Sequence, residues 1–148
     1  MFVPLILAGV ALASLALALW QWVEGRLFPL HERKRDYSFA PPITVLKPLK
    51  GADDQTESCL RSWFEQDYRG EVQLLFGVHT ADDHAAAVVG KLLAEFPKVD
   101  ARLIVCGERL GANAKVSTLV QLERQARNDL LVISDADVRA PKDLLAEL

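Results

Sequence analysis

The first 23 residues of this 148-residue chain contain no aspartate, glutamate, lysine, arginine or histidine. From Phe2 to Val23 the sequence is apolar apart from one serine and one glutamine. This length is close to the ~20 apolar residues that a helix needs to cross the hydrocarbon core of a bilayer. Trp20 and Trp22 lie at one end of the run, where an aromatic belt is expected. The sequence therefore predicts a transmembrane anchor over residues 1–23.

The alternative for this segment is a cleaved signal peptide, for which the small residues from Ala11 to Ser14 offer a cleavage site. A signal peptide normally has a basic residue before its apolar run and a shorter apolar region. Neither feature is present, so we favour an uncleaved anchor.

Basic residues follow the apolar run and none precedes it. The positive-inside rule then predicts that the N-terminus lies outside and the remainder of the chain in the cytoplasm. Residues 24–42 are predicted to form a basic juxtamembrane linker, in which Leu27 to Leu30 either lies at the lipid surface or is solvated. The nearby basic residues are Arg26, Arg33, Lys34 and Arg35.

Several common functional signatures are also missing. The two cysteines, Cys59 and Cys106, form no C-x-x-C or metal-type spacing, which predicts reduced, structural thiols of a cytoplasmic domain. The formal net charge of -3 provides no basic excess, so no nucleic-acid partner is expected. The first strand is not followed by the P-loop or dinucleotide-binding glycine patterns, and no G-x-S-x-G is present.

Beyond the linker, short apolar runs alternate with segments of helical periodicity. We expect strands at residues 43–46, 71–78, 101–105 and 130–133, with a helix in each interval. This β-α-β-α-β-α-β order predicts an α/β fold with a mostly parallel, Rossmann-like sheet.

Residues 141–148 begin with a proline and carry apolar residues at helical spacing. They predict the start of a further helix. Because that helix would be unfinished at Leu148, we expect the chain to be the N-terminal portion of a longer protein.

The stretch from Leu130 to Asp137 joins four apolar residues to two acids. The apolar run predicts a strand buried on both faces. Residues two apart in an extended chain point the same way, so Asp135 and Asp137 are expected to face one site. Two hard oxygen ligands suit Mg²⁺ or Mn²⁺, which in turn suit phosphates. The alternative is a pair of solvated acids in a turn.

In a parallel sheet the loops that follow the strands meet at one edge. Acids for a metal and lysines for phosphate at that edge predict a nucleotide-diphosphate site. Asp82 and Asp83 are also ordinary helix-capping residues, and we take His79 and His84 as surface or loop residues. The residues expected at the edge are Lys47, Lys50, Asp82, Asp83, Lys115, Asp135 and Asp137.

Four segments carry a resemblance to a known family: V-L-K-P-L-K-G at residues 45–51, Asp82-Asp83, Asn113-Ala114-Lys115, and S-D-A-D-V-R at residues 134–139. They resemble the ceramide glucosyltransferase family of inverting glycosyltransferases, including its bacterial branch of hopanoid-associated enzymes. The resemblance implies that residues 43–148 are the N-terminal part of a GT-A domain. It also implies a UDP-sugar donor, a divalent metal, and a lipid acceptor such as ceramide or a hopanoid that receives glucose or N-acetylglucosamine.

By their places in the family motifs, Asp83 is implied to contact the nucleotide base and Lys115 a nucleotide phosphate. Asp135 is implied to bind metal and diphosphate, with Asp137 as a less constant metal ligand. The sequence departs from the family at Thr118, where relatives often carry asparagine.

No catalytic residue is expected within this chain. The aspartate that acts as base in the family and the Q/R-x-x-R-W motif would both lie beyond Leu148. Other interpretations are a polyprenyl-phosphate or processive GT-A glycosyltransferase, an inactive membrane-tethered module that binds a nucleotide or a partner, and a receiver-like signalling domain.

Overall fold

The computed structural model describes residues 2–28 and 39–148. The chain divides into two compact units, Met1–Lys34 and Arg35–Leu148. The predicted juxtamembrane linker falls mostly outside the described residues, and with it the basic residues at 33, 34 and 35 and part of the segment from Leu27 to Leu30.

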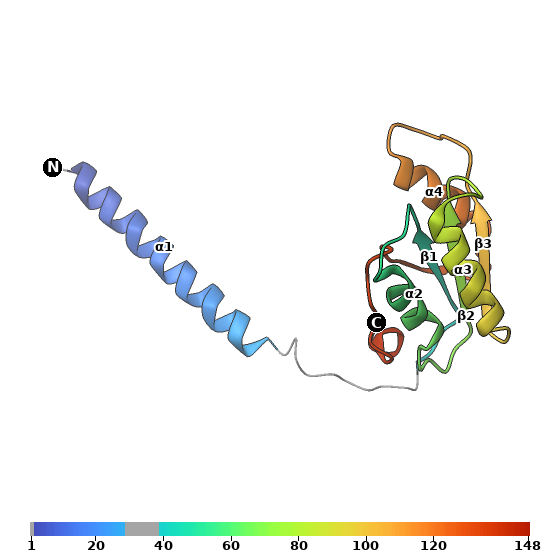
Figure 1. Cartoon of the computed structure of the whole chain (residues 1–148). Helices are drawn as coiled ribbons and strands as arrows, with labels where there is room; N and C mark the ends of the chain where they lie inside the picture. The colour runs from blue at the N-terminus through green and yellow to red at the C-terminus, as the bar shows by residue number, and fades with distance from the viewer. Residues whose placement is uncertain (1, 29–38) are drawn as a thin grey trace. The chain divides into compact units, whose positions relative to one another are not determined.

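Helix α1, Phe2–Leu27, forms the described part of the first unit (Figure 1). By length and composition it is apolar enough to cross a membrane, and none of its residues is buried. Polar contacts gather at its C-terminal end, where Trp20 Nε1 donates to Glu24 and the Arg26 guanidinium lies 4.7 Å from the Trp22 ring centroid. The helix therefore has an apolar body and an amphipathic end, as a span that meets a membrane surface requires.

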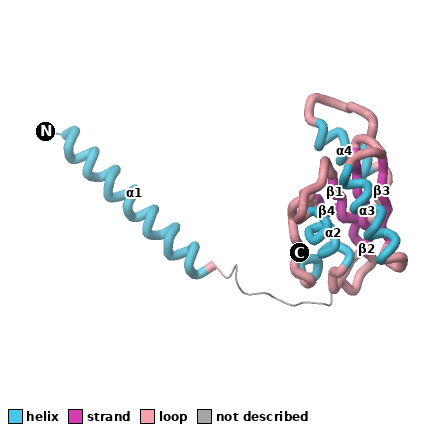
Figure 2. Tube along the Cα trace, in the orientation of Figure 1, coloured by secondary structure: helices cyan, strands magenta, loops and turns pink. Residues whose placement is uncertain are grey.

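The second unit contains a four-stranded parallel sheet (Figure 2). Its strands are β1 (Ile43–Pro48), β2 (Val72–Val78), β3 (Asp100–Val105) and β4 (Leu130–Ile133), in the order β3-β2-β1-β4. The predicted Rossmann-like parallel sheet is confirmed. The chain moves outward from β1 through β2 to β3 and then crosses to β4 on the other side of β1. Such a reversal leaves a crevice at the carboxyl ends of β1 and β4.

Helices cover both faces of the sheet. On one face α2 (Thr56–Phe64) and α3 (His84–Glu95) bury the larger core, which includes Trp63 and Phe76. On the other face α4 (Ala114–Glu123) packs over a smaller cluster that includes Cys106 and Leu122. Both cysteines are buried and free, as predicted.

Close approach of α4 to β2 depends on Gly77. A Cβ atom at this position would lie 2.6 Å from Thr118 Cγ2 and 3.0 Å from Leu122 Cδ1. Any larger residue would push α4 away from the sheet, and α4 also carries residues of the crevice.

Strand β4 differs from its prediction. It is an edge strand rather than one buried on both faces, and Leu130 and Ile133 are 49% and 58% exposed. The apolar run correctly indicated a strand, but the central position belongs to β1, whose residues from Ile43 to Lys47 are all buried. Burial depends on place in the sheet, which the composition of one strand does not reveal.

The helix predicted from Pro141 onward is also wrong. Only a single 3-10 turn, Leu144–Ala146, is present. The amide of Leu145 donates to Gln66 Oε1, and the carbonyl of Lys142 accepts from the amide of Asp67. These groups would otherwise serve the helical ladder, so bonds to the segment just after α2 replace continued helix.

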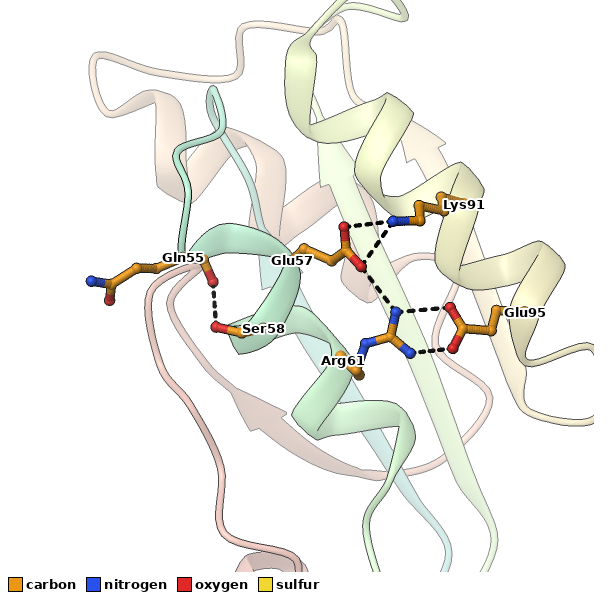
Figure 3. A network of polar contacts seen from close by, with 6 residues as sticks. All are labelled: Gln55, Glu57, Ser58, Arg61, Lys91 and Glu95. Atoms are coloured by element: carbon orange, nitrogen blue, oxygen red, sulfur yellow. Dashed lines mark hydrogen bonds and ion pairs between the residues drawn. The ribbon is translucent and has the colours of Figure 1, made fainter.

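A surface network of ion pairs joins α2 to α3 (Figure 3). Arg61 donates to Glu57 at 2.9 Å and to both carboxylate oxygens of Glu95, and Lys91 also pairs with Glu57. Hydrogen bonds from Arg61 hold the pKa of Glu95 below its usual 4.5, and those from Lys91 and Arg61 lower the pKa of Glu57. The network fixes how α2 lies against α3.

Replacing Glu95 by glutamine should lower the melting temperature at pH 7 and have little effect at an acidic pH below the folded pKa of Glu95. A carboxyl with a depressed folded pKa stabilises the fold above its unfolded pKa, and that contribution disappears as the pH falls through the folded value. Thermal melts of the full chain in detergent would measure this, with Glu65→Gln, at the exposed C-cap of α2, as the control. An equal loss at both pH values would contradict the ion-pair explanation.

Candidate active site

A cavity of about 690 Å³ lies at the carboxyl edge of the sheet. It is lined by residues that follow all four strands and by the first turns of α4. Four of the residues predicted for a nucleotide site line it together: Asp83, Lys115, Asp135 and Asp137. Lys50 also lines it, whereas Asp82 and His84 do not. A volume of this size suits a small-molecule ligand or a cofactor.

The two carboxylates after β4 lie on exposed positions of the cavity wall. The Asp135 side chain is 54% exposed. Its Oδ1 accepts a hydrogen bond from the ammonium of Lys115, which projects from α4, and the two side chains form an ion pair. Asp137 is also exposed. A cation and two acids thus converge on one side of the cavity.

Lys115 owes its position to the start of α4. Asn113 is the N-cap residue, and its side-chain oxygen accepts from the amide of Val116 at 3.2 Å. This cap places Lys115 in the first turn, on the side that faces β4. Thr118 lines the cavity one turn later, but its hydroxyl donates to the carbonyl of Ala114 at 3.2 Å.

Asp83 has a structural role as well as a place on the cavity wall. It caps α3, since its Oδ1 accepts from the amide of Ala85 at 2.9 Å. The same oxygen accepts from the amide of Gly51 at 2.9 Å, and Oδ2 lies 3.2 Å from that amide. Gly51 has a φ of 67°, a conformation that suits glycine. Oδ2 retains lone pairs for a further donor.

Lys47, on β1, lies next to this region but does not line the cavity. It is 1% exposed, and its Nζ donates to the Asp135 carbonyl at 2.6 Å and to Ser134 Oγ at 3.0 Å. Burial lowers the pKa of Lys47 to about 8, although Cys59, Asp135 and Asp137 oppose this shift. The structure therefore joins Lys47 to the backbone of the loop that follows β4, residues 134–141, here called the acidic loop.

Other residues on the cavity wall were not predicted as site residues. His79 follows β2, and its Nδ1 lies 3.2 Å from the Cys106 carbonyl. Glu108 and Arg109 follow β3. Their position immediately after predicted strands was a usable signal, because such loops share one edge of a parallel sheet.

The donor set of the cavity fits a metal ion shared with a ligand. The described residues contain no group of three or more histidine, cysteine, aspartate or glutamate side chains that could hold a metal. Mg²⁺ and Mn²⁺ commonly use one or two protein carboxylates and take their remaining ligands from phosphate and water. Asp135 and Asp137 match that arrangement.

A model of the family described as Glycosyl transferase family 21 matches residues 3–148. The chain belongs to this glycosyltransferase family. The resemblance found in the sequence motifs is therefore confirmed.

Two curated relatives illustrate the similarity. Ceramide glucosyltransferase 3 of Caenorhabditis elegans is 32% identical over 75% of this chain and 24% of its own length. A ceramide glucosyltransferase of Candida albicans is 32% identical over 70% of this chain and 21% of its own length. The chain thus spans about a quarter of the length of these relatives.

Solved structures support the same fold. The mannosyltransferase PcManGT of Pyrobaculum calidifontis, in complex with GDP-Man and Mn²⁺, matches 95% of this chain with a TM-score of 0.70 and 26% identity. This chain covers 41% of that structure. Staphylococcus aureus TarS, at 18% identity and a TM-score of 0.56, shows the fold alone.

Proposed function

We propose that this glycosyltransferase binds a UDP-sugar with Mg²⁺ or Mn²⁺ and passes glucose or N-acetylglucosamine to a lipid hydroxyl, such as that of ceramide or a hopanoid, with inversion. The observation that carries the proposal is the convergence of Asp135, Asp137 and Lys115 at the crevice beside β1 and β4. The 32% identity to ceramide glucosyltransferases favours this donor and acceptor.

Different residues of the cavity would bind different parts of the donor. Asp135 and Asp137 would hold the divalent ion, which offsets negative charge on the diphosphate. Lys115 would donate to a phosphate oxygen from the first turn of α4, where the helix dipole also favours an anion. Asp83 would accept from a base N–H through Oδ2, while its Oδ1 keeps the Gly51 loop in place.

Isothermal titration of the full chain in detergent with UDP-glucose, UDP-N-acetylglucosamine and GDP-mannose, each with and without Mn²⁺, would test this assignment. We expect tighter binding of the two UDP-sugars, and only in the presence of metal. Preference for GDP-mannose would overturn the UDP assignment in favour of the donor bound by the mannosyltransferase structure. Equal binding with and without Mn²⁺ would overturn the proposal that a divalent metal takes part in donor binding.

We also propose that α1 anchors the protein with its N-terminus outside and the cavity in the cytoplasm, where nucleotide sugars are available. The apolar length of α1 and the basic residues that follow the span support this orientation. Tags at Met1 and Leu148 would test it in membrane vesicles. The Leu148 tag should be accessible only from the cytoplasmic side, and protection in the reverse sense would overturn the orientation.

A further inference from the structure

Side chains from β1, from α2 and from the segment just after α2 form hydrogen bonds with the backbone of the loop after β4. Besides the two bonds from Lys47, Trp63 Nε1 donates to the Val138 carbonyl at 3.0 Å. The Ala140 amide donates to Ser62 Oγ at 2.9 Å, and Gln66 Nε2 donates to the Pro141 carbonyl at 2.7 Å. Ser62 and Trp63 belong to the last turn of α2, and Gln66 follows that helix by two residues.

These contacts reach backbone atoms on both sides of Asp137 and leave the two carboxylates exposed to the cavity. The amide of Ser134 still donates to the Leu46 carbonyl of β1, but residues 135–141 contain no helix or strand, so no regular hydrogen-bond ladder fixes their backbone. The bonds from β1 and α2 supply that restraint. Of the two carboxylates, that of Asp135 pairs with the ammonium of Lys115, which projects from α4.

Lys47 and Trp63 also bind each other. The Lys47 Nζ lies 4.5 Å from the centroid of the Trp63 ring, which is 2% exposed. A cation over an indole face is attracted to it, and more strongly when both are removed from water. Trp63 therefore uses its ring to position the lysine and its Nε1–H to hold the loop. Burying an ammonium carries a desolvation cost, which these partners offset.

We propose that Lys47 and Trp63 are positioning residues that fix the backbone at Asp135 and Val138, so that both carboxylates of the acidic loop face one divalent ion in the cavity. Neither residue lines the cavity. The ion-pair network between α2 and α3 supports the same function, because it fixes the helix from which Trp63 projects (Figure 3). The inference rests on the proposed metal-dependent binding of a nucleotide diphosphate.

The test uses the full chain in detergent with two variants, Lys47→Met and Trp63→Phe. Lys47→Met removes the ammonium and keeps an unbranched apolar chain, whereas Trp63→Phe keeps an aromatic ring and removes the Nε1–H. Val89→Ala, on α3, is the matched control because it removes volume from the same core at a side chain that cannot hydrogen-bond the loop backbone. Circular dichroism melts establish that each variant is folded and rank their stabilities.

The first readout is hydrogen–deuterium exchange of the peptide covering residues 134–142. We expect about tenfold faster exchange in either loop variant and no such local change in Val89→Ala, because local opening reports on local restraints. The second readout is UDP binding with and without Mn²⁺. Loss of supporting contacts around a metal ligand typically weakens metal binding by about 10- to 100-fold. We expect the enhancement by Mn²⁺ to fall about tenfold, with metal-free UDP binding unchanged.

The outcomes separate this inference from the proposed function. If wild type binds UDP equally with and without Mn²⁺, the metal assignment fails and the positioning role fails with it. If wild type responds to Mn²⁺ and the folded variants respond equally, only the positioning role is overturned. Unchanged exchange at residues 134–142 in both variants, or the same losses in Val89→Ala, would also overturn it. If one variant does not fold, the other decides the result.

Discussion

Replacing Asp135 by asparagine should remove the part of nucleotide-diphosphate affinity that depends on Mn²⁺. Asparagine keeps the shape of the side chain but removes the negative charge that a hard divalent cation requires. We expect the enhancement of UDP affinity by Mn²⁺ to fall by about 100-fold, which corresponds to about 2.8 kcal/mol. Calorimetric titration of UDP at several Mn²⁺ concentrations would measure it.

Two comparisons sharpen this experiment. Asp137→Asn should weaken the response to Mn²⁺ less, because its position is the less constant one in the family pattern. Asp82→Asn removes an acid that lies outside the cavity and should leave the response unchanged. A folded Asp135→Asn protein with an undiminished response to Mn²⁺ would show that the metal is held elsewhere.

The sequence was sufficient to predict the sheet and the edge at which the charged residues meet. Alternating short apolar runs and helical segments specify parallel strands, and parallel strands deliver the loops that follow them to one side. Asp83, Lys115, Asp135 and Asp137 therefore converge as expected, even though they are separated by up to 54 positions in the sequence. Their roles toward a donor remain predictions.

Positions that depend on three-dimensional neighbours could not be predicted. Nothing in the run from Leu130 to Ile133 distinguishes an edge strand from a central one. The sequence analysis also placed Lys47 among the phosphate contacts, because it follows the apolar part of β1. Its side chain is instead buried against Trp63 and the loop backbone, a contact between residues 16 positions apart that local patterns do not encode. The direction in which the Lys47 side chain points is decided by its packing against these neighbours.

The second large effect concerns Lys115, whose ammonium shares Asp135 Oδ1 with any cation bound there. A divalent ion that binds this carboxylate competes with the ammonium for its negative charge. Lys115→Ala should therefore increase the affinity of the chain for Mn²⁺ alone by about tenfold, because the competing positive charge is gone. The same variant should bind UDP about tenfold more weakly at saturating Mn²⁺, because a charge-assisted hydrogen bond to phosphate is lost.

The two affinities should change in opposite directions if the Lys115 ammonium pairs with Asp135 in the free protein and with phosphate when UDP is bound. A general electrostatic effect of the lost charge would not require this. Lys98→Ala removes the same charge from the loop between α3 and β3 and should alter neither affinity. Electron paramagnetic resonance of free Mn²⁺ would measure the first affinity, and calorimetry with UDP the second. If Lys115→Ala weakens both, the lysine supports the structure of the site. If it strengthens both, its only effect is repulsion of the metal, and phosphate must be held by another group such as Lys50 or Arg109 on the same wall.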